Sequence, residues 1–125
     1  MNIEVSIGEA VDKLSILAIK LGKISDPDKL KNISTEHSYL LRRLSEIGIN
    51  ESTEGYINLL RVNKKLWKIE DAIREKEFKK EFDTEFIGIA RSVYKTNEER
   101  SMWKKNIDKA FNSWFSEEKQ YAKFE

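Results

Sequence analysis

The spacing of the apolar residues is the feature that most constrains how this chain can fold. Apolar side chains recur at intervals of three and four residues along most of the 125-residue chain, which is the period of one face of an α-helix. Only 1 proline, Pro27, and 5 glycines interrupt the pattern. Because proline and glycine are the residues that break or end helices, their scarcity favours long helices. The sequence therefore predicts an all-α protein.

Two helices are expected before residue 50. The first begins at the capping box "SIGE" and ends at Gly22. The second begins at Asp26, a good N-cap that is followed by proline, and is closed by Gly48. Its apolar seam consists of Leu30, Ile33, His37, Leu40, Leu44 and Ile47. Because only a few residues join these helices, they should be antiparallel neighbours.

The rest of the chain predicts three more helices: a long one from about Thr53 to about Lys80, a short one capped by Asp83, and a fifth that opens at Thr96 with a second capping box. The long helix has a second stripe beside its main seam, made of Tyr56, Leu60, Asn63, Trp67, Glu70, Arg74 and Glu77. This stripe is too apolar to face water alone, so the fifth helix or a second copy of the protein should cover it. We expect one domain, residues 1–125, folded as an antiparallel bundle of about five helices with coiled-coil-like seams.

Composition excludes several classes of function. The formal net charge is +1, so no global field would hold nucleic acid or an anionic membrane. The chain has no cysteine, which excludes disulfides, thiolate metal sites and cysteine catalysis. Its first residues lack the regions of a signal peptide, and no apolar run is long enough to span a membrane. These features predict a soluble cytoplasmic protein.

Catalytic and metal-binding signals are weak. His37 is the only histidine and lies on an apolar seam, which is typical of a core histidine bonded to a neighbour. Glu9 and Asp12 have the spacing of helix carboxylates that hold a metal, but one such pair does not make a cluster. The phosphate-binding glycine loops and the common hydrolase motifs are absent. We therefore predict no metal site and no cofactor.

The stretch "IARSVYKTNEERSMWKK" raises a specific question, because it concentrates polar side chains around the expected start of the fifth helix. The first amides of a helix attract anions, so this junction could bind a phosphate or a carboxylate. Glu98 and Glu99, however, already supply negative charge to that first turn. We favour a structural corner in which Arg91 or Arg100 pairs with an acid of the third helix, Glu70 or Asp71. The anion site remains the alternative.

Four segments follow one another along the chain: "VSIGEAVDKLSILAIK", "NKKLWKIEDAIR", "FIGIARSVYKTNEER" and "SEEKQY". Together they resemble a bacterial domain family of unknown function whose members are small, helical and soluble. The resemblance covers most of the chain and implies no activity, cofactor or substrate. It draws attention to a set of polar positions: Glu9, Asp12, Lys13, Asn63, Trp67, Glu70, Asp71, Arg74, Arg91, Tyr94, Asn97, Arg100, Glu117, Glu118, Lys119 and Tyr121. A bundle corner alone does not require so many, which keeps a polar site open.

Two functional hypotheses follow. The first is a non-enzymatic interaction or assembly module, self-associating as a homodimer. The alternative is the binding, or magnesium-dependent hydrolysis, of a small phosphorylated metabolite such as a nucleotide or nucleotide-sugar. Its candidate residues are Asn63, Trp67, Glu70, Asp71, Arg74, Arg91, Tyr94, Asn97 and Arg100. In that case the arginines would bind phosphate oxygens, and Glu70 and Asp71 would orient them or hold magnesium. A solvent-open pocket lined by these charged side chains would favour the alternative.

Overall fold

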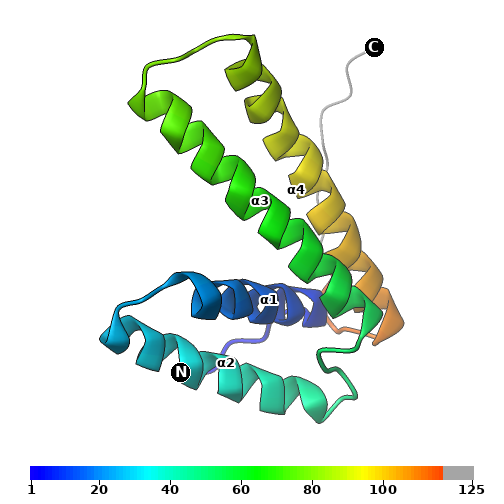
Figure 1. Cartoon of the computed structure of the whole chain (residues 1–125). Helices are drawn as coiled ribbons and strands as arrows, with labels where there is room; N and C mark the ends of the chain where they lie inside the picture. The colour runs from blue at the N-terminus through cyan, green and yellow to red at the C-terminus, as the bar shows by residue number, and fades with distance from the viewer. Residues whose placement is uncertain (117–125) are drawn as a thin grey trace.

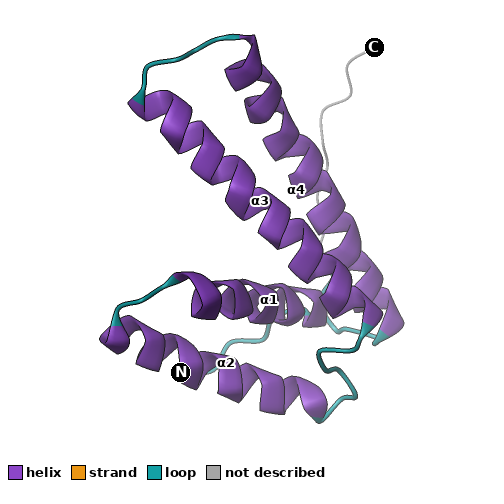
Figure 2. Ribbon diagram, in the orientation of Figure 1, coloured by secondary structure: helices purple, strands orange, loops and turns teal. Residues whose placement is uncertain are grey.

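The computed structural model describes residues 1–116 and contains four helices and no strand in that part of the chain (Figures 1 and 2). The helices are α1 (Ile7–Lys23), α2 (Pro27–Ser45), α3 (Glu54–Phe78) and α4 (Thr84–Ala110). The prediction of an all-α protein is therefore confirmed. None of these helices combines the length and the apolar character that crossing a membrane requires.

The helices are arranged as two hairpins that cross (Figure 1). One hairpin is α1 with α2, and the other is the longer pair α3 with α4. α1 packs against each of the other three helices, whereas α2 packs against α1 alone. The expectation of a single antiparallel bundle is thus met only in part, because α2 contacts neither α3 nor α4.

The expected break at Thr96 does not exist, and the count of five helices is corrected to four. α4 runs without interruption from Thr84 to Ala110, and Thr96 is buried in its middle. No proline or glycine follows Gly88 in this helix. The local capping pattern at Thr96 does not start a new helix, because packing along one continuous face of α4 against α3 favours an unbroken helix.

Three of the expected helix starts are confirmed by side-chain caps. Ser6 accepts a hydrogen bond from the amide of Glu9, at 3.1 Å. Asp26 caps α2 and Asp83 caps α4 in the same way. Each cap satisfies amides that the helix itself leaves without a partner.

The apolar core lies where α1 crosses the base of the α3/α4 hairpin. Its buried side chains are Val11, Leu14, Leu44, Ile49, Tyr56, Leu59 and Ile107. Ile49 replaces the expected seam residue Ile47, because α2 ends at Ser45 and Gly48 turns the chain with a φ of 84°. Ile47 is consequently 47% exposed, whereas Ile49 is fully buried.

Beyond the end of α1, which lies beside Trp67 and Lys68, the α3/α4 hairpin continues as a projection that only these two helices form (Figure 1). We call residues 67–95 the distal arm. No residue from Trp67 to Lys95 is buried. The second stripe of α3 divides at this point: Tyr56 and Asn63 are covered, and Glu70 and Arg74 lie exposed on the arm. α1 thus provides the cover that the sequence analysis assigned to a fifth helix or a second copy, but only for the first half of the stripe.

Candidate functional site

A buried polar cluster joins three helices beside the core. Asp12 and Ser15 come from α1, Asn63 from α3 and Arg100 from α4. Arg100 donates to Asp12 twice, from Nε to Oδ1 at 2.9 Å and from Nη2 to Oδ2 at 2.6 Å. The Nδ2 group of Asn63 donates to Asp12 Oδ1 at 2.9 Å and to Ser15 Oγ at 2.8 Å. The Asp12–Arg100 cluster therefore ties the first hairpin to the second.

This cluster is closed rather than open to a ligand. Asp12 is 2% exposed, and both of its carboxylate oxygens already accept hydrogen bonds from protein groups. Ser15 donates to the backbone carbonyl of Asp12 at 2.6 Å. Within residues 1–116 no buried side-chain nitrogen or oxygen lacks a partner. A satisfied buried network of this kind fixes the register of the helices and leaves no group with which to bind substrate.

The start of α1 is docked on α4 by a second set of polar contacts. The amide of Gly8 donates to Asp108 Oδ1 at 2.7 Å, and the amide of Ile7 donates to Ser113 Oγ at 2.9 Å. The Nζ of Lys104 lies 2.9 Å from the carboxylate of Glu9. Asp108 thus occupies the place where the first amides and the dipole of α1 would attract an external anion.

The charged candidates from the sequence are not brought together. Arg74 pairs weakly with Glu70 and Asp71 of its own helix, at 3.8 and 3.6 Å, and all three are exposed. Arg100 lies instead at Asp12, so the expected pairing of Arg100 with Glu70 or Asp71 is wrong. Arg91 is exposed and has no hydrogen bond or ion pair with any residue from 1 to 116. None of these three arginines lines either of the two surface hollows on α3.

The anion site considered at Thr96 would require the free amides of a helix start, but no helix begins there. The amides around Thr96 lie in the interior of α4. Glu99 is not a capping partner but accepts a hydrogen bond from Arg61 of α3 at 2.6 Å, and this bond holds the pKa of Glu99 below its usual range. Tyr94 is about half exposed and Asn97 is half-buried in the same helix. The polar stretch is thus divided between faces of α4: Glu99 contacts α3, whereas Arg91, Tyr94 and Glu98 are exposed.

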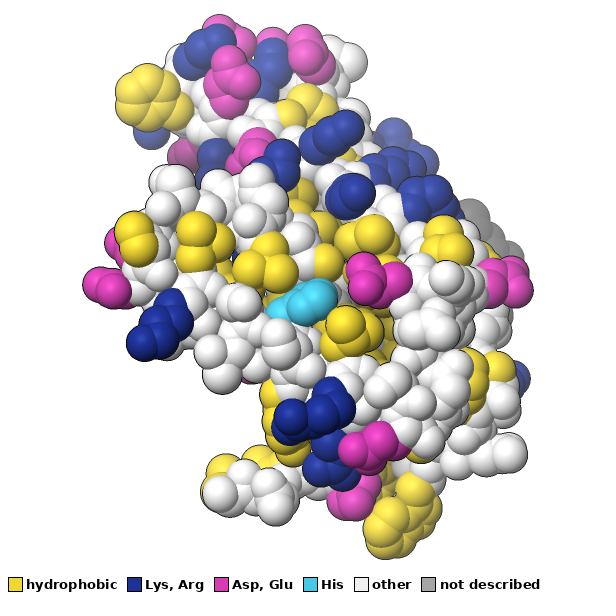
Figure 3. All heavy atoms as spheres, turned by 60° about the horizontal axis from the view of Figure 1, so that its bottom comes forward, with side chains coloured by type: hydrophobic (Ala, Val, Ile, Leu, Met, Phe, Trp, Pro, Cys, Tyr) yellow, Lys and Arg dark blue, Asp and Glu magenta, His cyan; other side chains and the backbone are white. Residues whose placement is uncertain are grey.

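The carboxylates considered as metal ligands and His37 lie in different surroundings. No group of three acidic or histidine side chains that could hold a metal ion occurs between residues 1 and 116. Glu9 and Asp12, the carboxylates with suitable spacing, are each paired with a cation. His37 is half-buried among hydrophobic side chains (Figure 3), but it makes no hydrogen bond within the described chain, so the expected bonded core histidine is wrong.

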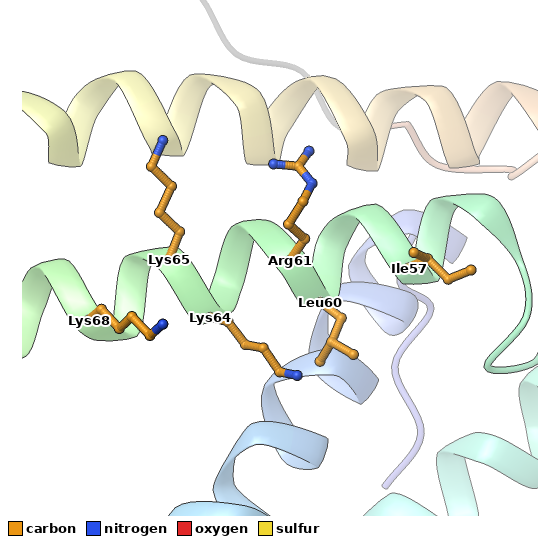
Figure 4. A pocket seen from close by; sticks show the side chains of 6 residues that line it. All are labelled: Ile57, Leu60, Arg61, Lys64, Lys65 and Lys68. Atoms are coloured by element: carbon orange, nitrogen blue, oxygen red, sulfur yellow. The ribbon is translucent and has the colours of Figure 1, made fainter.

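Basic side chains of α3 line two hollows on the surface of the molecule. Two hollows, of about 500 and 260 Å³, share Lys64 and Lys68. The larger one follows the outer face of α3, where Arg61 and Lys65 reach toward α4 and Lys64 points the other way (Figure 4). The smaller one lies between α3 and the end of α1 and is lined by Trp67 and Lys23 as well. Lys23, Lys64 and Lys68 have no hydrogen bond or ion pair with residues 1–116.

The sequence analysis missed part of this arrangement. It gave Lys64 and Lys68 no role, whereas both line one hollow together with Trp67. It gave Ser15 and Asp108 no role, although both are buried and hydrogen-bonded. The available signal was Asp12 and Ser15 at i,i+3, directly beside the apolar residues Val11 and Leu14.

Comparison of the sequence with protein-family models, with curated proteins and with solved structures finds no match. The family that the four sequence segments suggest therefore stays a prediction. The functional argument depends on the geometry of the molecule itself.

Proposed function

We propose that this protein is a non-enzymatic self-association module that works as a homodimer, with the distal arm as the element that a second copy covers. The absence of any buried residue from Trp67 to Lys95 is the observation that carries this proposal. Helices in water owe most of their stability to the burial of an apolar face against other elements. Among residues 1–116 no third layer covers this two-helix projection, so it lacks that support within the described part of the chain.

The arm also keeps apolar side chains in water. Four large ones are between 49% and 87% exposed: Phe78, Phe82, Ile87 and Tyr94. Full burial of such a side chain typically stabilises by about 1.5–3 kcal/mol, so most of this gain is still available to an interface. The half-buried apolar residues of the arm, which include Ile69, Ile73 and Val93, would add to the free energy gained on burial.

Ion pairs hold the two helices together at the end of the arm, which indicates that the arm is formed before any association. Lys76 Nζ lies 3.0 Å from Asp83, 3.3 Å from Glu81 and 3.4 Å from Glu85, across the turn between α3 and α4. The hydrogen bond with Asp83, together with those to the other two acids, raises the pKa of Lys76 above its usual range. A hairpin that is closed at its tip and uncovered along its sides is suited to packing against another copy.

Sedimentation velocity over a range of protein concentrations tests the proposal. We expect a species of twice the 14.7 kDa chain mass, together with a melting temperature that rises with concentration because association stabilises the folded state. A single 14.7 kDa species and a concentration-independent melting temperature would contradict it. Phe78→Ser and Ile87→Ser should weaken association, whereas Ile47→Ser, far from the arm, should not.

The hollow beside Trp67 supports a second candidate function, which is the binding of a small anion with an apolar or aromatic part, such as a nucleotide. Lys23, Lys64 and Lys68 surround it without acidic partners from residues 1–116, and Trp67 offers an aromatic surface. Lysines bind phosphate as point charges, and an indole ring can stack on a base or a sugar. This keeps Trp67 as a ligand candidate and moves the site from the arginines to the lysines.

Calorimetric titration with a nucleoside diphosphate tests this second function. We expect binding that weakens at least tenfold in Lys64→Gln/Lys68→Gln, since each charged hydrogen bond contributes roughly 1.5–3 kcal/mol. Lys29→Gln/Lys31→Gln is the matched control on α2, with the same loss of charge. If both double variants lost the same amount of affinity, the loss would come from net charge and not from the hollow. If the unmodified protein did not bind, a nucleotide ligand would be excluded.

A further inference from the structure

The outer face of α4 carries a stripe whose charged side chains have no partner among residues 1–116. Its members recur at helical spacing on the side opposite α3: Ile87, Arg91, Tyr94, Glu98 and Met102. The three apolar members are each about half exposed. Arg91 and Glu98 make no hydrogen bond or ion pair with residues 1–116. Seven residues separate them, or about 10 Å along the helix, which is too far for a pair within α4.

This stripe is complementary to itself when it is reversed. If two copies of α4 lie antiparallel about a two-fold axis between Tyr94 and Lys95, residue numbers that face each other sum to 189. Arg91 then faces Glu98 of the second copy, and Ile87 faces Met102, each twice by symmetry. The two Tyr94 rings lie beside the axis. The reversed stripe therefore matches charge with opposite charge and apolar with apolar.

A parallel arrangement gives the opposite result. It would place Arg91 beside Arg91 and Glu98 beside Glu98, and like charges that face each other oppose association. Lys95 lies at the edge of the stripe in either arrangement, so it does not distinguish between them. The distribution of charge thus selects one direction and one register.

We infer that α4 pairs antiparallel with α4 of a second copy through Ile87, Arg91, Tyr94, Glu98 and Met102, with Arg91 and Glu98 exchanging ion pairs across the interface. This inference rests on the self-association proposed above and specifies its surface. It also gives Arg91 and Tyr94 a role in recognition of a second copy, in place of the ligand-binding role considered from the sequence.

A charge exchange tests the pairing. Arg91→Glu alone, or Glu98→Arg alone, replaces two attractive contacts with two repulsive ones, and we expect the dimer Kd to rise about tenfold or more. The combined variant Arg91→Glu/Glu98→Arg restores opposite charges and should return the Kd to within about threefold of the original, since such surface pairs are interchangeable. Circular dichroism should show unchanged helix content in all three, because both positions are exposed.

Disulfide cross-linking gives an independent measure of register, because the chain has no cysteine of its own. Tyr94→Cys brings the two thiols together at the axis and should cross-link readily. Ile87→Cys should not, because the two copies of residue 87 lie 15 positions apart along the pair, or about 22 Å.

The outcomes separate the two proposals. A monomer at every concentration overturns self-association and the pairing with it. A dimer whose Kd responds equally to the single and the combined charge variants keeps self-association and overturns the α4 pairing. Cross-linking through Ile87→Cys in preference to Tyr94→Cys overturns the antiparallel register.

Discussion

Arg100 of α4 holds Asp12 of α1 through two parallel hydrogen bonds, of 2.9 and 2.6 Å, although 88 residues separate them in the sequence. Asp12 is nearly inaccessible, and the guanidinium is 28% exposed. Bidentate pairs of this kind are strong and directional. The pair therefore sets both the angle and the register at which the first hairpin crosses the second.

Removal of the carboxylate should be costly. Asp12→Ala removes the carboxylate that accepts hydrogen bonds from Arg100 and from the amide of Asn63, and breaking a buried pair in this way typically costs about 3–5 kcal/mol. Urea denaturation with circular dichroism measures the change. Asp71→Ala removes an exposed carboxylate from a weak pair and should change the free energy of unfolding by less than about 0.5 kcal/mol. A cost for Asp12→Ala as small as that of the control would contradict the role assigned to the pair.

The caps were predictable from sequence because they are decided within one helical turn. Ser6, Asp26 and Asp83 need only a free amide two or three residues later. Thr96 had the same local pattern, yet α4 continues through it, because the face that packs on α3 runs past this point. Local rules set the candidates for helix ends, and tertiary packing selects among them.

The partner of Asp12 could not be predicted in the same way. The chain has 23 lysines and arginines, and the crossing angle of two hairpins decides which of them reaches a given carboxylate. Arg100 was recognised as a residue of interest, but it was assigned to Glu70 or Asp71 because those acids lie on the expected neighbouring helix. The error follows from the false helix break, which placed Arg100 at a junction instead of in the middle of α4.

The turn after α2 offers a matched pair of substitutions. Ile49 is fully buried in the core, whereas Ile47, two residues earlier, is 47% exposed. Ile49→Ala should cost about 2–5 kcal/mol through lost burial and the cavity that remains, and Ile47→Ala should cost less than about 1 kcal/mol. Equal effects of the two substitutions on the urea midpoint would contradict this difference in burial and would favour Ile47 as the last core residue of α2, as the helical spacing alone suggests.

Two glycines distinguish close packing from helix propensity. A Cβ at Gly8 would overlap the carbonyl oxygen of Lys104 and lie 2.9 Å from Asp108 Oδ1, whereas a Cβ at Gly88 would meet nothing within 4 Å. Gly8→Ala should therefore destabilise by about 1–3 kcal/mol, because α1 must move away from α4. Gly88→Ala lies inside α4 and should stabilise by roughly 0.5–1 kcal/mol. Stabilisation by both substitutions, measured as melting temperature, would exclude the close approach at Gly8.

The ion pair between Arg61 and Glu99 predicts a specific dependence on pH. Arg61 donates to Glu99 at 2.6 Å, and this bond lowers the pKa of Glu99 in the folded state. A carboxyl group whose pKa is depressed by folding contributes stability at pH values above its unfolded pKa, and that contribution is lost as pH falls through the folded pKa. The pair should therefore stabilise at neutral pH and lose its effect in acid.

Glu99→Gln isolates this contribution. At pH 7 the variant should be less stable than the unmodified protein by about 0.2–1 kcal/mol, a modest figure because Arg61 is half exposed. The difference should begin to shrink below the unfolded pKa of about 4.3 and should approach zero only below the lowered folded-state pKa of Glu99, where the carboxyl group is protonated in both states. Glu77→Gln, whose partner Lys80 lies at 3.9 Å on the surface, is the matched control and should show little difference at either pH. If the gap between Glu99→Gln and the unmodified protein stayed constant from neutral to acid pH, then lost packing rather than charge would explain it.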